Sequence, residues 1–171
     1  KIVSAISEER FNRIKNYNGF PKKALGYTLK KFDLKLKEFD YIIYGIIDNI
    51  NPDKNIRSNF INKFLETPKK YHKRIEERIN TEIIWNKKHI NNIKKFAKKN
   101  KILHKLVFVD HHESHAASAY FCSPFMNANI FTFDGKGGFR SSSHYIGKNN
   151  YFERKNYLTT FDSLGYFYGN I

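Results

Sequence analysis

The sequence predicts a mixed α/β fold, and three observations support this class. Short apolar runs rich in β-branched and aromatic residues alternate with amphipathic segments of helical period. The 171 residues suit one domain, or part of a larger one. Hydrophobic residues form 40% of the chain and aromatic residues 16%, which supplies a core and excludes a wholly disordered basic chain.

Residues 1–51 are expected to hold a strand, a helix and a second strand. Residues 1–7 alternate like a strand entered from a preceding hairpin, and because the chain starts without Met, we interpret it as part of a longer protein. Pro21 suits the first position of a helix over residues 22–32. Residues 40–47 form a short apolar run that is typical of a buried strand.

Residues 52–105 are interpreted as a basic helical insertion of two or three amphipathic helices. They are rich in Lys, Asn, Ile and Glu. Apolar residues recur there at helical spacing, namely Ile75, Ile79, Ile83, Ile90, Ile93 and Ala97.

The remaining residues predict strands around one short helix. The expected elements are a buried strand at 106–109, a helix at 112–121, a strand at 129–133, a strand pair at 141–147 and 151–157 joined by a turn at 148–150, and the start of a helix at 163–169. A glycine-rich turn is expected after the strand at 129–133, over residues 134–138.

The formal net charge of +15 suggests a nucleic-acid partner, but its distribution argues otherwise. The net charge is +4 over residues 1–51, +11 over residues 52–106 and zero over residues 107–171. The excess therefore lies in the insertion, where we favour solvent-facing helix surfaces over nucleic-acid binding.

The sequence also excludes some locations for the protein. No apolar run approaches the roughly 20 residues of a bilayer span, and no secretory signal pattern is visible. We expect a cytoplasmic protein without membrane attachment. Cys122 is the single cysteine, which fits a reducing compartment, and we interpret it as a buried structural thiol.

The strongest local signal for chemistry is the segment DHHESH at 110–115. On a helix, His111 and His115 lie four residues apart on one face, close enough to hold one divalent metal. A pair of surface histidines, or a helix start capped by Asp110, explains the same pattern. A third ligand would favour the metal, and Asp134, after an apolar strand, is the natural candidate.

The glycines after Asp134 have two interpretations. Without Cβ atoms, Gly135, Gly137 and Gly138 allow backbone N–H groups to approach phosphate oxygens, with Lys136 as a cationic contact. The alternative is a simple glycine turn between two strands.

Several motifs, in this order, resemble the N-terminal part of O-carbamoyltransferases of the nodulation and antibiotic-tailoring type. They are SAISEERFNRIK at 4–15, GFPKKA at 19–24, DHHESHAASAY at 110–120, SPF at 123–125, FDG at 133–135 and SLGYFY at 163–168. The resemblance covers almost the whole chain except the basic insertion.

The resemblance implies an actin-like ATPase fold of the ribonuclease-H-like kind, with a mixed sheet and flanking helices. It implies that a C-terminal domain makes carbamoyl-adenylate from carbamoyl phosphate and ATP, and that this N-terminal domain moves the carbamoyl group to a hydroxyl of a small-molecule acceptor. It also implies an iron-type metal, most simply Fe²⁺, held by His111, His115, Asp134 and a later aspartate. That later ligand, the family's first strand and the adenylate-forming domain have no counterpart in the 171 residues, so we interpret the chain as a partial catalytic unit.

Other roles follow less directly. His112 and Glu113 are candidates for the group that deprotonates the acceptor, although a helix-start role accounts for them too. Arg10 and Lys15, like Lys136, are candidate phosphate contacts or solvated surface residues.

Three other interpretations stay open at this point. A relative of the tRNA threonylcarbamoyl-transferases would share the fold and the HxxxH pattern. A basic nucleic-acid-binding module would use residues 52–106. A truncated or inactive remnant would lack the first strand and the fourth ligand.

Overall fold

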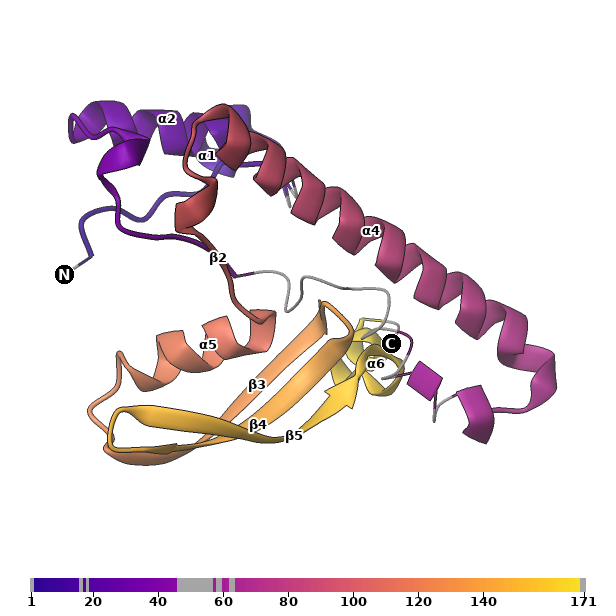
Figure 1. Cartoon of the computed structure of the whole chain (residues 1–171). Coiled ribbons are helices and arrows are strands. Elements are labelled where there is room, and N and C mark those ends of the chain that lie inside the picture. The colour runs from indigo at the N-terminus through magenta and orange to yellow at the C-terminus, as the bar shows by residue number, and fades with distance from the viewer. Residues whose placement is uncertain are drawn as a thin grey trace. The chain divides into compact units, whose positions relative to one another are not determined.

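A computed structural model describes residues 2–15, 17, 19–45, 57, 60–61 and 64–169 of the chain. The chain divides into two compact units (Figure 1). The first contains Lys1–Ile42 and Asn91–Leu106, and the second contains Ile43–Ile90 and Val107–Ile171. Helices and sheets are both present, so the predicted mixed α/β class is confirmed.

The first unit is built around helix α2 (Lys22–Lys31), which lies where the sequence predicts a helix. Pro21 precedes the first helical residue instead of occupying it. Helix α1 (Glu9–Asn12) comes before it, and the buried carboxylate of Glu8 accepts hydrogen bonds from the backbone N–H groups of Lys23 (3.1 Å) and Ala24 (2.7 Å). Glu8 therefore occupies the electropositive start of α2, where an acidic group is stabilising.

The strand predicted over residues 1–7 is absent from the part of it that the structure describes, residues 2–7. Ile2 is 79% exposed and Val3 is 66% exposed. A strand needs hydrogen bonds to a neighbouring strand, and no described segment pairs with these residues. The alternation of side chains alone is therefore not sufficient to form the strand.

Strands β1 (Ile42–Tyr44) and β2 (Leu106–Phe108) are hydrogen-bonded neighbours in a two-stranded sheet. β1 is shorter than the predicted strand at 40–47, of which residues 46 and 47 lie outside the described residues. In the second unit, the ladder continues with a hydrogen bond from Val109 N to Tyr44 O (3.1 Å). β2 is half-buried and not fully buried as predicted.

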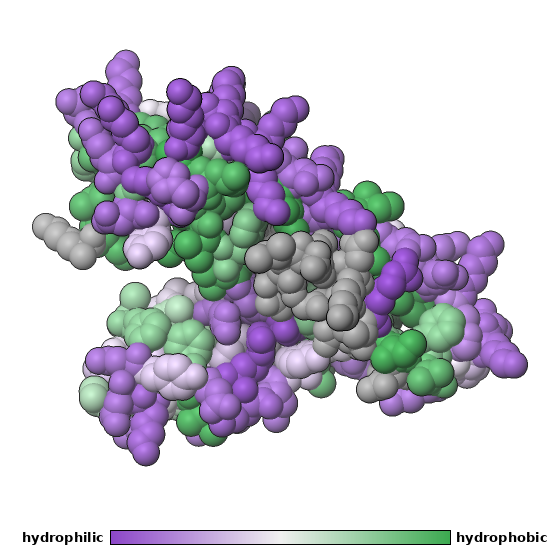
Figure 2. Space-filling view, viewed as in Figure 1, coloured by the Kyte–Doolittle hydropathy of each residue, from purple (hydrophilic) through white to green (hydrophobic). Residues whose placement is uncertain are grey.

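Helix α4 (His72–Lys99) is one continuous helix of 28 residues and carries both predicted apolar runs. In the second unit, its isoleucines pack with Phe60 and Phe139. Hydrophilic side chains project along the part of the surface that α4 follows (Figure 2), as we predicted for the excess charge. Of the predicted insertion, residues 52–56, 58–59 and 62–63 lie outside the described residues.

The second unit contains an antiparallel sheet in the order β3 (Asn127–Gly137), β4 (Arg140–Lys148) and β5 (Tyr151–Thr159) (Figure 1). The turn between β4 and β5 contains Asn149 and Asn150, both with positive φ (50° and 63°), as a tight hairpin turn requires. This confirms the predicted strand pair and its turn.

Helix α5 (His111–Tyr120) packs on β3 and β4 through a small buried cluster. The cluster consists of Ala116, Tyr120, Ile130 and Tyr145. Helix α6 (Leu164–Tyr168) follows β5, and the hydroxyl of Ser163 accepts the backbone N–H of Tyr166 at its start. Both helices were predicted from the sequence.

The predicted glycine turn at 134–138 is wrong in its position. β3 continues to Gly137, and the reversal falls at Gly138, whose φ is 69°. Phe133 pairs with Ser142 and Gly137 pairs with Arg140, so three residues of β3 face one residue of β4. Asp134 therefore lies in a β-bulge, which allows a strand to redirect a side chain.

None of the helices that the structure describes is both long and apolar enough to cross a membrane. Cys122 is exposed, which corrects the expectation of a buried thiol. The cysteine follows α5 at the surface and is not part of the core.

Candidate metal centre

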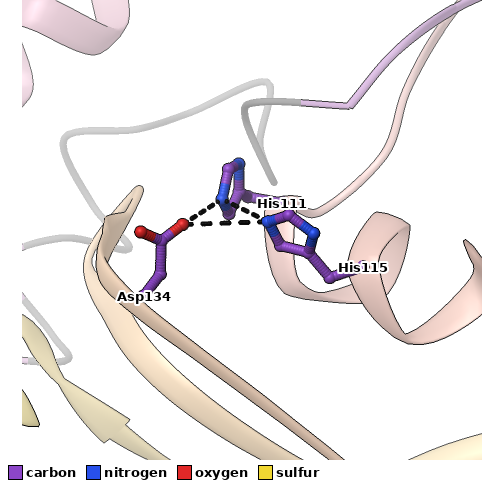
Figure 3. Close-up of side chains that lie close together, drawn as sticks. All are labelled: His111, His115 and Asp134. Carbon is purple, nitrogen blue, oxygen red and sulfur yellow. Dashed lines mark hydrogen bonds and ion pairs between the residues drawn. The ribbon is translucent and has the colours of Figure 1, made fainter. Parts of the chain in front are cut away.

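Three side chains converge between α5 and β3 (Figure 3). Nε2 of His111 lies 2.7 Å from Oδ2 of Asp134 and 3.0 Å from Nε2 of His115. The third edge, from Nε2 of His115 to Oδ2 of Asp134, is 3.7 Å. The structure therefore brings together the three residues that the sequence nominated as ligands.

The size of this triangle fits a shared metal ion. Two donor atoms at about 2.1 Å from one ion lie about 3.0 Å apart at a right angle and about 3.4 Å apart at the tetrahedral angle. The three observed edges fall around these values. Two imidazole nitrogens and a carboxylate oxygen suit iron, manganese or zinc.

The site is partly open to solvent. The side chains of His111, His115 and Asp134 are 23%, 53% and 35% exposed. An open site leaves coordination positions for a substrate or for a further ligand, as in metal sites that act on bound molecules.

Asp110 fixes the start of α5, immediately before the first candidate ligand. Its Oδ1 accepts the backbone N–H of Glu113 (2.8 Å), which is a helix N-cap bond. The sequence left open whether Asp110 caps the helix or the segment binds a metal. In the structure, the helix cap and the metal-sized triangle are both formed, so the two interpretations are compatible.

The second carboxylate oxygen of Asp110 holds a buried ion pair. Oδ2 pairs with Nη1 of Arg140 and lies 3.3 Å from Nη1 of Arg154. Burial raises the pKa of Asp110, but the two arginines and the Glu113 N–H outweigh burial and hold the pKa below its ordinary value. Asp110 therefore stays ionised and links α5 to β4 and β5.

His112 is fully buried, which argues against the expected role as a base that touches substrate. Its Nδ1 lies 2.8 Å from the hydroxyl of Thr132. Burial lowers the pKa of His112, only partly offset by a hydrogen bond with the Arg140 backbone and by the charge of Asp110. His112 is thus a neutral core histidine that joins α5 to β3.

The glycines of the bulge have a packing role. A Cβ at Gly137 would lie 2.2 Å from Cδ2 of His111 and 3.0 Å from Nε2 of His112, so the two rings require a glycine there. Lys136 forms an ion pair with Glu82.

The other candidates are placed as follows. Glu113 lies in the first turn of α5, and its side chain is half-buried. Arg10 lies in α1 and Lys15 follows that helix, both in the first unit. The triangle of candidate ligands lies in the second unit.

Sequence reasoning missed the buried charged residues around the site, above all Arg140 and Glu82. One signal was available for Glu82. It occupies a position on the apolar face of α4, between Ile79 and Ile83, where a charged residue needs a buried partner. Arg140 had no such signal.

Fold and site together define an α/β domain with a candidate metal centre of two histidines and one aspartate. A family model described as "Carbamoyltransferase N-terminus" matches residues 1–171. The chain therefore belongs to the carbamoyltransferase N-terminal family, as its motifs predict.

The chain is similar to three curated proteins. It is 34% identical to the uncharacterized protein sll1178 of Synechocystis over 87% of the chain, and 27% identical to the nodulation protein NolNO of Sinorhizobium fredii over 98%. It is 29% identical to the uncharacterized protein MJ1051 of Methanocaldococcus jannaschii over the whole chain. The chain spans 24%, 23% and 25% of these relatives, about a quarter of their length.

Proposed function

We propose that this chain is part of the transfer domain of an O-carbamoyltransferase. In this proposal a carbamoyl group moves from carbamoyl-adenylate to a hydroxyl of a small-molecule acceptor. A C-terminal domain of the full-length protein makes the adenylate from carbamoyl phosphate and ATP. The full-length protein works in the cytoplasm. The fold proposed for the complete domain is the actin-like ATPase fold.

The observation that carries the proposal is the triangle of His111, His115 and Asp134 in a chain of this family. In support, the three residues match the ligand positions that the family resemblance implies. We propose Fe²⁺ as the bound ion. When bound, the ion acts as a Lewis acid and neutralises negative charge on the oxygens of the donor.

The transfer itself requires little from the protein beyond positioning, because a mixed anhydride already carries an activated carbonyl. The acceptor oxygen forms a bond to the carbamoyl carbon, the bond from that carbon to the phosphate oxygen breaks, and AMP leaves. The proton of the acceptor hydroxyl passes to solvent or to a basic group next to the bound acceptor. The described side chains hold the site in place for this step, with Asp110 and His112 fixing α5.

The metal assignment is tested on the full-length protein by elemental analysis of the wild type, His111→Ala and Asp134→Ala. We expect about one ion per chain in the wild type and loss of most of it in both variants. His104→Ala, which changes an exposed histidine outside the triangle, is the control and should retain the metal. Unchanged metal content in both ligand variants would refute the assignment.

The reaction class is tested with the same proteins, ATP and radiolabelled carbamoyl phosphate. We expect the wild type to release pyrophosphate from ATP only when carbamoyl phosphate is present. His111→Ala should retain that release, because the adenylate forms in another domain, and should lose transfer of label to hydroxyl compounds. A wild type that releases no pyrophosphate would refute the carbamoyl-adenylate route.

A further inference from the structure

The bulge that carries Asp134 is held by side chains from two helices. The three residues between Phe133 and Gly137 lie out of register with β4, so the ladder does not fix their backbone. A ligand on such a segment needs other contacts to keep its carboxylate in place.

Helix α6 supplies the first set of contacts. The hydroxyl of Ser163 lies 2.9 Å from the carbonyl oxygen of Gly135 and 3.3 Å from that of Asp134. A Cβ at Gly165 would lie 2.8 Å from the backbone nitrogen of Gly135, so α6 packs directly on the bulge. The Ser-Leu-Gly motif thus has a structural explanation.

Helix α4 supplies the second set through Glu82. The side chain of Glu82 is 1% exposed, and both of its oxygens lie 3.1 Å from Nζ of Lys136 in the bulge. The same carboxylate lies 3.2 Å from Nη2 of Arg78. A buried carboxylate with two cations is costly to disrupt, because removal of one partner leaves an uncompensated charge.

The two sets of contacts are connected. Arg78 donates a hydrogen bond to the hydroxyl of Tyr166 in α6 (3.2 Å). The ring of Tyr166 lies 3.5 Å from the position of a Cβ on Gly135. Glu82 therefore closes a ring of contacts that runs from α4 through the bulge to α6 and back.

From this arrangement we propose that Glu82, in the basic helical segment, is a positioning residue for the metal ligand Asp134. The inference rests on the metal centre proposed above. Glu82 does not touch the metal. It holds Lys136, two residues beyond Asp134, and so sets the direction of the bulge. The basic segment over residues 52–106, which carries most of the excess positive charge, therefore contributes to the site through a negative residue.

The test measures Co²⁺ affinity and the Co²⁺ ligand-field absorption of the full-length protein, with and without Glu82→Gln. We expect Glu82→Gln to weaken Co²⁺ binding about 10- to 100-fold, the usual cost of losing an outer contact of a metal ligand. Lys136→Met should produce a similar loss. Glu77→Gln, an exposed glutamate on the same helix, is the matched control and should bind as the wild type does.

The decisive comparison repeats Glu82→Gln in an Asp134→Ala background, titrated to Co²⁺ concentrations high enough to load the two remaining histidine ligands. If Glu82 acts through Asp134, the substitution has no further effect on affinity once that ligand is gone. An equal loss in both backgrounds would show a general structural role and overturn the inference. If Glu82→Gln does not fold, Lys136→Met takes its place in the same comparison.

The failures of the two proposals are distinguishable. A wild type that binds no Co²⁺ would refute the metal centre and the positioning role together. The positioning role alone would be refuted if the wild type bound Co²⁺ through Asp134 and Glu82→Gln and Lys136→Met both stayed within about threefold of the wild-type affinity. The expected loss is about 10-fold or more.

Discussion

The buried ion pair between Asp110 and Arg140 predicts a large local effect of Arg140→Met. Methionine removes the charge and retains much of the apolar volume. Asp110 then keeps the Glu113 N–H and Arg154, whose Nη1 lies 3.3 Å from Oδ2, but loses its closest cation. Because its side chain is 2% exposed, water does not replace that partner.

The expected cost follows from this geometry. Removal of one partner from a buried ion pair costs about 3–5 kcal/mol, and the remaining contacts of Asp110 place this case near about 3 kcal/mol. At about 1.4 kcal/mol per factor of ten, this corresponds to a roughly 150-fold change in the equilibrium for opening α5.

Hydrogen–deuterium exchange of the full-length protein measures this opening for each segment. Protection of the α5 amides should fall about 100-fold or more in Arg140→Met, from the cost estimated above. Protection in α2, which belongs to the other unit, should not change. If protection in α5 stayed within about threefold of the wild type, well under 1 kcal/mol, the pair would not anchor this helix.

Three further predictions concern residues beside the ligands. Burial raises the pKa of Asp110, but the two arginines and the Glu113 N–H outweigh burial and hold the folded-state pKa below its ordinary value. The stability that comes from the ionised form is therefore complete above about pH 3.9 and is lost as the pH falls through the lower, folded-state pKa. Protection of the α5 amides, measured against pH, should follow this course. Gly137→Ala should weaken Co²⁺ binding at least about 10-fold, because its Cβ would lie 2.2 Å from Cδ2 of His111. Gly138→Ala is the control: its Cβ has open space around it, so it should cost only about 1 kcal/mol of backbone strain and retain the affinity. His112→Ala removes a buried ring and its hydrogen bond, so the thermal midpoint by circular dichroism should fall, by an amount equivalent to about 2 kcal/mol or more, and an unchanged midpoint would contradict its role in the core.

The candidate ligands could be predicted from the sequence because the signals are local. His111 and His115 share a helix face by their spacing, and Asp134 is the acidic residue that follows the next apolar run. A helix start at Asp110 also follows from residue type. Each of these inferences needs only the residues within one or two elements.

The contacts that support the ligands depend on pairings between distant parts of the chain. Glu82 and Lys136 are 54 residues apart, and Asp110 and Arg140 are 30 apart. The glycines after Asp134 suggested a turn because glycine is frequent in turns, whereas here Gly137 is required by the histidine rings packed against it. Local propensity does not report such tertiary contacts.

The candidate ligands also lie close together along the chain, since His111 and Asp134 are 23 residues apart. All three leave the ribosome within a short stretch of synthesis, and closing so short a loop costs little chain entropy. Metal uptake would stabilise the folded arrangement of α5 against β3 by mass action. Supply of the proposed metal during translation would then influence how much of the newly made protein acquires this part of its fold.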